Sequence, residues 1–247
     1  MKPTLLIPIF DHGDTIAGVV AALAVHELPC LIVDDGSREP TRRVLAEIEA
    51  RHRFVSLLRR DRNGGRGAAL KSGYRKAFAR GFTHAIQLDA DGQHDASDVP
   101  AFVRAIRQDP EALVLGAPRF DASAPRARLY GRQLSRAMVW LTTLSFAVED
   151  PLCGFRGIPL AATCELLRGP SLGDHMEFDP ELVIALVRSG VPVCNLPTRV
   201  VYAEGGLSHF DLWRDNARLT RVYGRALASL PFELPGALRR AARACRA

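Results

Sequence analysis

The stretch HAIQLDADGQHD, residues 84–95, joins a short apolar run to a series of acidic and amide side chains. The apolar part, 84–90, predicts a buried β-strand. Polar side chains stand at every second position from the end of this run, namely Asp89, Asp91, Gln93 and Asp95. Carboxylates two residues apart repel one another unless a cation or a set of hydrogen-bond donors lies between them. The stretch therefore predicts a strand whose end binds a charged group.

Apolar strands and amphipathic helices alternate on both sides of this stretch. Strands are predicted at 4–10, 30–35, 55–60, 84–90 and 112–118, and helices at 15–28, 41–52, 68–81 and 98–108. Strands that are almost uniformly apolar and alternate with helices are typical of a parallel sheet covered on both faces. We therefore expect an α/β fold with a mostly parallel central sheet and helices on both faces.

The pattern is less regular after residue 118. We expect one or two helices over 127–147, a helix over 176–190 and one or two strands over 191–202. The sequence contains no internal repeat and no low-complexity linker. One domain over 1–211, followed by a basic helical tail over 212–247, is the simplest organisation.

The positive charge of the chain is concentrated in this tail. The net charge is +6, and the tail carries eight arginines against Asp215 and Glu233, so the rest of the chain is balanced. Four of these arginines recur at helical intervals, namely Arg214, Arg218, Arg221 and Arg225. A basic amphipathic helix is typical of peripheral contact with an anionic membrane. A solvated helix packed on the domain is the alternative.

A pI near 9.4 is also compatible with nucleic-acid binding. Aromatic residues make up only 7% of the chain, and the excess charge is confined to one end. Both features argue against a surface that binds nucleic acid. We therefore expect no nucleic acid among the partners.

The cysteines and the apolar segments bear on the cellular compartment. The five cysteines are scattered without C-x-x-C spacing, which argues against a zinc site or a disulfide framework and favours a reducing compartment. The N-terminal apolar run is too short for a signal peptide. No apolar stretch reaches the roughly 18 residues of a membrane-spanning helix. We expect a cytoplasmic protein that lies peripherally on the inner face of the cytoplasmic membrane.

A second acidic pair supports a binding site at the edge of the sheet. Asp34 and Asp35 in VDDGS end the strand 30–35, as Asp89 and Asp91 end another. The carboxyl ends of parallel strands meet at the edge where α/β proteins bind ligands. Oxygen ligands of this kind suit Mg²⁺ or Mn²⁺. Solvated turns capped by aspartates are the alternative.

The acidic stretch does not match an EF-hand loop. Counted from Asp89, such a loop needs glycine at its sixth position and glutamate at its twelfth. This chain has His94 and Pro100 there. The spacing therefore argues against a calcium-binding helix–loop–helix.

A glycine-rich stretch, RNGGRGAALKS at 62–72, precedes and opens the helix predicted at 68–81. It is not a Walker A loop, because Leu70 rather than glycine precedes Lys71. Leu70 also stands where a dinucleotide-binding fingerprint has its third glycine. Backbone N–H groups and Arg66 at the start of a helix suit an anion. A plain tight turn is the alternative.

Four motifs in this order resemble family 2 glycosyltransferases, which have the Rossmann-like GT-A fold. They are VDDGS, N-x-G-R-G-A-A at 63–69, the D-x-D at 89–91, and DPLCGFRG at 150–157. The last is similar to a segment of the polyprenyl-phosphate branch, which includes dolichol-phosphate mannose synthases. The resemblance covers roughly residues 4–210. It implies a GT-A catalytic domain over 1–211 and a metal-dependent, inverting transfer of sugar from a nucleotide-diphosphate sugar. The implied acceptor is lipid-linked, first a polyprenyl phosphate and second a hydroxyl of a glycolipid or similar lipid.

The resemblance also implies a donor and metal site. By the family pattern, Asp34 and Asp35 contact the base and ribose. Asp89 lies near the ribose or the metal, Asp91 binds the Mg²⁺ or Mn²⁺ that bridges the diphosphate, and Gln93 joins the metal shell. The remaining donor-binding residues that the resemblance implies are Pro8, Asp11, Gly65, Arg66, Gly67 and His209. Asp11 and His12 replace the more usual Asn-Glu of the family.

The expected catalytic residues follow from the charge that develops on the leaving nucleoside diphosphate. Arginines stabilise that charge where it forms. Arg156 matches the family motif best. Arg66, Arg119 and Arg132 are further candidates, with a surface salt bridge as the alternative for each. A hydroxyl acceptor also needs a general base, for which Asp150, Glu177 and Asp179 are the candidates. A phosphate acceptor is already ionised and needs none.

Overall fold

The computed structural model describes residues 1–119, 126–169, 172–200 and 211–244. Within them, one seven-stranded sheet has the strand order β3-β2-β1-β4-β6-β5-β7. The strands are β1 (Pro3–Ile9), β2 (Cys30–Asp34), β3 (Val55–Arg59), β4 (His84–Gln87), β5 (Leu113–Arg119), β6 (Arg156–Pro159) and β7 (Val193–Arg199). All neighbouring pairs are parallel except those that β6 makes with β4 and β5. The expected α/β fold with a mostly parallel sheet is confirmed.

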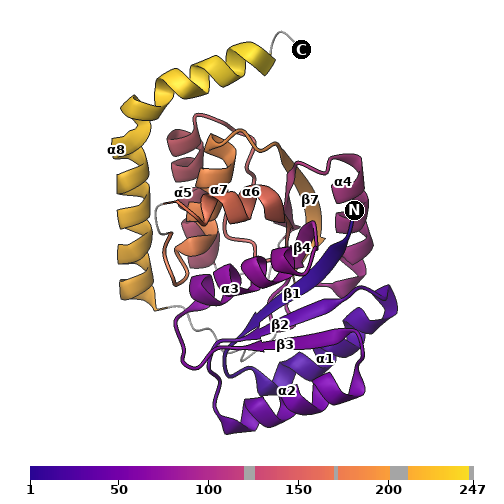
Figure 1. The fold of residues 1–247 in the computed structure, drawn as a ribbon. Coiled ribbons are helices and arrows are strands. Elements are labelled where there is room, and N and C mark those ends of the chain that lie inside the picture. The colour runs from indigo at the N-terminus through magenta and orange to yellow at the C-terminus, as the bar shows by residue number, and fades with distance from the viewer. Residues whose placement is uncertain (120–125, 170–171, 201–210, 245–247) are drawn as a thin grey trace.

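Helices cover both faces of the sheet (Figure 1). One face packs against α1 (Gly13–Leu23), α2 (Glu39–Arg51) and α4 (Val99–Gln108), and the other against α3 (Arg66–Ala79), α6 (Leu160–Leu166) and α7 (Phe178–Arg188). Successive residues of β1 alternate between the two cores: Leu5 and Ile7 pack with the first set, and Leu6 with the second. This alternation explains why the strands are apolar throughout.

Two elements were not predicted from the sequence. Strand β6 has only four residues and begins with a buried arginine, and α6 has only seven residues. Strand β4 ends at Gln87, before the predicted limit at residue 90, so Asp89 already lies in the following loop. The segment 127–147 forms a single helix, α5 (Arg126–Thr143), and the described part of 191–202 contributes one strand, β7.

The tail forms a long helix, α8 (Leu212–Ala244), which changes direction in its second half (Figure 1). Pro231 and Pro235 would normally interrupt a helix, whereas the backbone stays helical through both. Proline within a helix removes a hydrogen bond and bends the axis.

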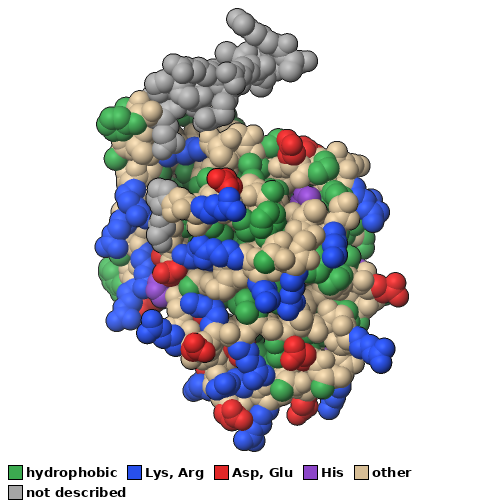
Figure 2. Space-filling view, in the orientation of Figure 1, with side chains coloured by type: hydrophobic (Ala, Val, Ile, Leu, Met, Phe, Trp, Pro, Cys, Tyr) green, Lys and Arg blue, Asp and Glu red, His purple; other side chains and the backbone are tan. Residues whose placement is uncertain are grey.

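The first half of α8 is part of the folded body. Leu219, Val222 and Tyr223 are buried, and Arg188 of α7 donates to the carbonyl of Ala226 at 2.6 Å. Lys and Arg side chains are spread over the face that carries α3 and α8 (Figure 2). No described helix is both long enough and apolar enough to cross a membrane.

Candidate active site

Three charged side chains from distant parts of the chain meet at the carboxyl edge of the sheet. Arg66, the first residue of α3, lies 2.6 Å from Asp89 Oδ1 through Nη1 and 2.7 Å from Asp179 Oδ2 through Nε. Asp89 follows β4, and Asp179 lies in the first turn of α7. Burial alone would raise the pKa of Asp89, but Arg66 and His94 outweigh it and hold that pKa well below its usual range. Asp89 is therefore a carboxylate at neutral pH.

His94 is a neighbour of Asp89 and was not predicted to be a site residue. Its Nε2 lies 3.4 Å from Asp89 Oδ2, and its ring packs against Phe155 with centroids 5.5 Å apart. A Cβ on Gly154 would collide with the Asp89 carboxylate. The loop after β4 and the segment 150–157 thus pack directly on one another around Asp89.

Asp91 and Gln93 complete the loop after β4. The backbone N–H of Gln93 donates to Asp91 Oδ1 at 3.0 Å. Burial, and then the nearby charge of Asp89, raise the pKa of Asp91 above its usual value. A divalent cation between the two carboxylates would relieve this unfavourable charge.

The donor set therefore fits a hard divalent cation, which prefers oxygen ligands. The described residues contain no cluster of three or more His, Cys, Asp or Glu side chains with metal-binding geometry. A cation here would thus rely on Asp91, Asp89 and the Gln93 amide together with oxygens of a bound ligand. Mg²⁺ is bound in this way in many phosphate sites.

The aspartates after β2 face the protein. Asp34 Oδ1 accepts a hydrogen bond from the N–H of Ser37 at 2.9 Å. Asp35 is ion-paired with Arg60 and accepts from the N–H of Gly65 at 2.8 Å. Both aspartates are buried. Asp35 therefore anchors the glycine-rich loop, and contact of either residue with a base or ribose stays a prediction.

The glycine-rich loop packs against the segment 172–178. Gly65 has φ +97°, and a Cβ on Gly67 would come within 2.5 Å of Phe178 Cβ. The N–H of Ala68 donates to the carbonyl of Asp174 at 3.0 Å. In this structure the two glycines allow close packing, and amides at the start of α3 have protein acceptors. The anion contact predicted for Gly65 and Gly67 stays a prediction.

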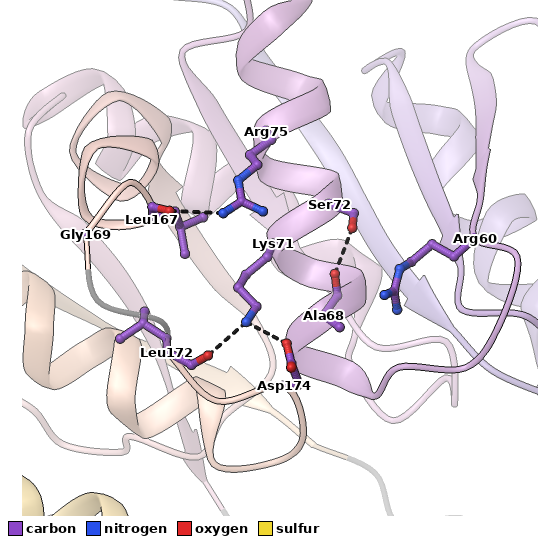
Figure 3. Close-up of a pocket in the computed structure, with 9 residues that line it drawn as sticks. All are labelled: Arg60, Ala68, Lys71, Ser72, Arg75, Leu167, Gly169, Leu172 and Asp174. Atoms are coloured by element: carbon purple, nitrogen blue, oxygen red, sulfur yellow. Dashed lines mark hydrogen bonds and ion pairs between the residues drawn. The ribbon is translucent and has the colours of Figure 1, made fainter.

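Lys71 of α3 also contacts the segment 172–178 (Figure 3). Its Nζ lies 2.8 Å from the Leu172 carbonyl and 2.6 Å from Asp174 Oδ1. These residues line a pocket of about 360 Å³ with Arg60 and Arg75. Because Arg60 is bound to Asp35 and Arg75 to the Leu167 carbonyl, the cations here stabilise the loops around α3.

Two of the residues predicted to bind the donor, Pro8 and Asp11, lie in β1 and in the loop that follows it. Pro8 is buried within β1, opposite Val33 of β2. Asp11 has φ +54° and accepts from the N–H and Nε of Arg38 at 2.8 and 2.7 Å. Asp11 therefore joins the loop after β1 to the start of α2. His209 lies outside the described residues.

Arg156 is fully buried and donates to three carbonyls. Its Nε, Nη2 and Nη1 lie 2.6, 2.7 and 3.0 Å from the oxygens of Cys153, Pro151 and Asp179. Its Nη1 is also 3.1 Å from Asp179 Oδ1. This arrangement corrects the expectation that Arg156 faces a leaving group: the side chain has no exposed surface, and it positions the segment 150–157 and Asp179.

The other two candidate general bases, Asp150 and Glu177, also contact other residues of the protein. Asp150 Oδ2 lies 2.5 Å from Arg132 Nη1, and Asp150 Oδ1 accepts from the N–H of Leu152 at 2.8 Å. Glu177 Oε1 accepts from the N–H of His175 at 3.3 Å. The second oxygen of Glu177 is buried and has no hydrogen-bond partner among the described residues.

An arginine-rich pocket lies beside Asp150, at the end of β5 and on the same sheet edge as Asp89. It has a volume of about 320 Å³. Its lining residues are Ala117, Pro118, Arg119, Leu129, Arg132, Gln133, Arg136, Glu149, Asp150 and Pro197. Three arginines, Arg119, Arg132 and Arg136, therefore line a pocket beside the segment that contacts Asp89. Sequence analysis named Arg119 and Arg132 but did not identify the pocket, because it depends on how β5 and α5 pack.

An α/β sheet with acidic loops at its carboxyl edge and arginines around them is the architecture of a glycosyltransferase of the GT-A type. The comparisons with known proteins identify the family. Residues 4–156 match the model of Glycosyl transferase family 2, and the chain belongs to this family. It is therefore a glycosyltransferase, as the four motifs predict.

Several curated relatives match along most of the chain. A UDP-N-acetylglucosamine–dolichyl-phosphate N-acetylglucosaminyltransferase of Methanococcus voltae is 25% identical over 217 residues, covering 81% of this chain and 86% of the relative. An undecaprenyl-phosphate mannosyltransferase of Micrococcus luteus is 27% identical over 222 residues, covering 84% of this chain and 87% of the relative.

Solved structures share the fold. The glucosyl-3-phosphoglycerate synthase of Mycobacterium tuberculosis, in complex with Mn²⁺ and UDP-glucose, has a TM-score of 0.63 at 15% identity and covers 89% of this chain and 75% of its own. The mannosyltransferase PcManGT of Pyrobaculum calidifontis, in complex with GDP-Man and Mn²⁺, has a TM-score of 0.60 at 17% identity and covers 100% of this chain and 75% of its own. These likenesses confirm the fold predicted from the sequence.

Proposed function

We propose that this family 2 glycosyltransferase transfers a sugar, with inversion, from a nucleotide-diphosphate sugar to a polyprenyl phosphate. The observation that carries the choice of acceptor is the arginine-rich pocket beside Asp150. Guanidinium groups bind phosphate through paired hydrogen bonds. The relatives named for dolichyl-phosphate and undecaprenyl-phosphate acceptors support the same class of acceptor.

The segment 150–157 links this pocket to the donor site. Asp150 at its start pairs with Arg132 in the pocket, and Gly154 in its middle packs on Asp89. An acceptor phosphate in the pocket would therefore lie next to a donor held at the aspartates. This proximity supports direct displacement, because reacting groups that are held together lose little entropy on reaction.

The proposed reaction is a single displacement. An oxygen of the acceptor phosphate forms a bond to the anomeric carbon as the bond from that carbon to the donor diphosphate breaks, and the electron pair leaves on the diphosphate. A divalent cation, Mg²⁺ or Mn²⁺, held by Asp91, Asp89 and Gln93, would stabilise the charge on that diphosphate. Arg66, which lies 2.6 Å from Asp89, would add a cation of the chain itself to this stabilisation.

The state of the candidate bases also favours a phosphate acceptor. Asp150 is paired with Arg132, and Asp179 with Arg66 and Arg156. In each carboxylate both oxygens already contact an arginine or a backbone N–H. A phosphate nucleophile needs no proton removed, so these carboxylates serve to position arginines.

The second candidate acceptor is a hydroxyl of a glycolipid or similar lipid. It is favoured by Glu177, whose Oε2 is buried and has no hydrogen-bond partner among the described residues. A carboxylate oxygen of this kind is available to take a proton from an alcohol. Localisation at the inner face of the cytoplasmic membrane, and the expected lack of nucleic-acid binding, stay predictions.

The deciding experiment compares a polyprenyl phosphate with the matching polyprenol as acceptors in detergent micelles, with UDP- and GDP-sugars and Mn²⁺. We expect transfer to the phosphate only. Arg132→Gln should raise KM for the phosphate acceptor, while the thermal shift produced by the donor nucleotide is retained. Arg104→Gln, an exposed arginine on α4, is the matched control. Transfer to the alcohol that is lost in Glu177→Gln would instead establish the hydroxyl acceptor.

A further inference from the structure

Helix α5 carries an unusual exposed apolar stripe. Among the described residues, half of the exposed large hydrophobic side chains lie in α5 or just after it. They are Tyr130, Leu134, Leu141, Leu144 and Phe146. The first three lie in α5 and are spaced by four and seven residues, which places them on one face of the helix. Leu144 and Phe146 follow the last residue of the helix, Thr143. Helices α2 and α4 expose no large hydrophobic side chain.

The stripe is not used to hold α5 on the protein. The opposite side of the helix buries Ser135, Val139 and Thr142 and packs against α7 and α8. Tyr130 and Phe146 are 74% and 81% exposed. An apolar stripe of this length on a soluble surface marks a contact site for another apolar phase or molecule.

The charged residues of α5 are all cationic. Its 18 residues include Arg126, Arg128, Arg132 and Arg136 and no carboxylate. Arg136 lies over the ring of Trp140, with its guanidinium carbon 4.8 Å from the centroid, and Trp140 meets Phe146 edge to face at 5.1 Å. Arg132 and Arg136 on the side of α5 next to the exposed Tyr130, Leu134 and Leu141 are typical of a helix that lies in a membrane interface.

The stripe is continuous with the arginine-rich pocket. Leu129, Arg132, Gln133 and Arg136 of the same helix line that pocket. The apolar stripe and the pocket therefore occupy neighbouring faces of one helix. A lipid phosphate at the pocket would have its hydrocarbon chain beside the stripe.

We propose that α5 docks this enzyme on an anionic lipid bilayer, with the stripe in the acyl region and the arginines among the headgroup phosphates. This deepens the proposed function, on which it rests for the lipid nature of the acceptor. It differs from the sequence-based expectation, which assigned membrane contact to the tail. Charge favours lipid over a second copy of the chain, because a symmetric dimer across α5 would bring the same arginines together.

The first test is co-sedimentation with vesicles of phosphatidylglycerol and phosphatidylcholine, which needs no turnover. The variant Leu134→Gln/Leu141→Gln should bind at least about tenfold more weakly, because two buried leucines are lost from the lipid phase. The control Val25→Gln/Phe78→Gln changes exposed apolar residues elsewhere and should bind like wild type. A retained thermal shift with donor nucleotide shows that the variants are folded. Unchanged binding of the α5 variant overturns the proposal, whatever the acceptor assay gives.

The second test uses the two tryptophans of the chain, Trp140 on α5 and Trp213 on α8. In Trp213→Phe, emission from Trp140 should shift to the blue on adding anionic vesicles. In Trp140→Phe, emission from Trp213 should move little. The reverse pattern would make the tail the membrane contact and overturn the proposal. A concentration-dependent dimer abolished by Leu134→Gln/Leu141→Gln, without vesicle binding, would also overturn it.

Discussion

Gly154 packs directly against the carboxylate of Asp89, so closely that a side chain at position 154 would occupy the space of Asp89 Oδ2. The contact joins the loop that follows β4 to the segment 150–157. Asp89 is thereby fixed between Gly154 on one side and Arg66 on the other. The position of the proposed metal ligand thus depends on a residue more than sixty positions away that carries no functional group.

Gly154→Ala should therefore displace Asp89 and impair donor binding without any change of charge. We expect transfer to fall by about 100-fold, the typical cost of misplacing a reacting group by about 1 Å. The Mn²⁺-dependent thermal shift with UDP or GDP should also disappear. The control is Gly18→Ala in α1, where a Cβ meets nothing within 4 Å. That variant should gain about 0.5–1 kcal/mol of stability. Equal behaviour of the two variants would contradict the role of Gly154.

Arg66→Ala should destabilise the metal-free protein. Asp89 and Asp179 would lose the cation that they share, and leaving partly buried acceptors without this partner costs about 1–3 kcal/mol. Adding Mn²⁺ should restore part of this loss, because a metal ion can replace the missing charge. Urea unfolding with and without Mn²⁺ measures both effects. Arg43→Ala removes an exposed pair with Glu39 and should cost no more than about 0.5 kcal/mol. If Arg66→Ala loses no more free energy of unfolding than Arg43→Ala, the contact of Arg66 with Asp89 and Asp179 does not stabilise the fold as proposed.

The sequence predicts those parts of the fold that depend on local pattern. The five parallel strands up to Arg119 are apolar runs between amphipathic helices, so their order and type follow from periodicity. Strand β6 was missed because RGIP has four residues and starts with an arginine, which is buried only because three carbonyls surround it. Proline normally ends a helix, so the sequence pattern does not by itself predict that α8 continues through Pro231.

The sequence predicts where the site lies, at the carboxyl edge of the sheet. It does not predict which side chains contact one another there. The acidic pairs fall at strand ends that a parallel sheet brings together, and this could be foreseen. The contact of Arg66 with Asp179 joins residues 113 positions apart, and no local pattern encodes it. The glycines at 65 and 67 predict an anion contact, which stays a prediction; their packing against Phe178 and Asp174 depends on tertiary structure that the sequence pattern does not encode.

Asp91→Asn should separate stability from activity. Burial and Asp89 raise the pKa of Asp91, so its negative charge is unfavourable in the metal-free fold. The neutral amide removes that cost, and we expect a higher melting temperature without metal. Transfer should fall by about 100-fold or more, as when one group that stabilises transition-state charge is removed. Thermal shift and a transfer assay on the same preparation test both. A variant that is less stable without metal, or that keeps its response to Mn²⁺, would contradict the proposed ligand role.

His84 should make the stability of the fold depend on pH in the mildly acidic range. Burial lowers its pKa below the usual 6.5, although the hydrogen bond with the Pro110 carbonyl partly offsets this. The folded state therefore favours the neutral ring, while the unfolded chain binds a proton near pH 6.5. The stabilising contribution is complete above that pH and is lost as the pH falls toward the folded pKa. His84→Gln, which can still donate to Pro110, should lack this component in urea unfolding between pH 7.5 and 5.5. If the wild type and His84→Gln have parallel pH profiles of stability, the pKa of His84 is the same in the folded and unfolded states, and the prediction is wrong.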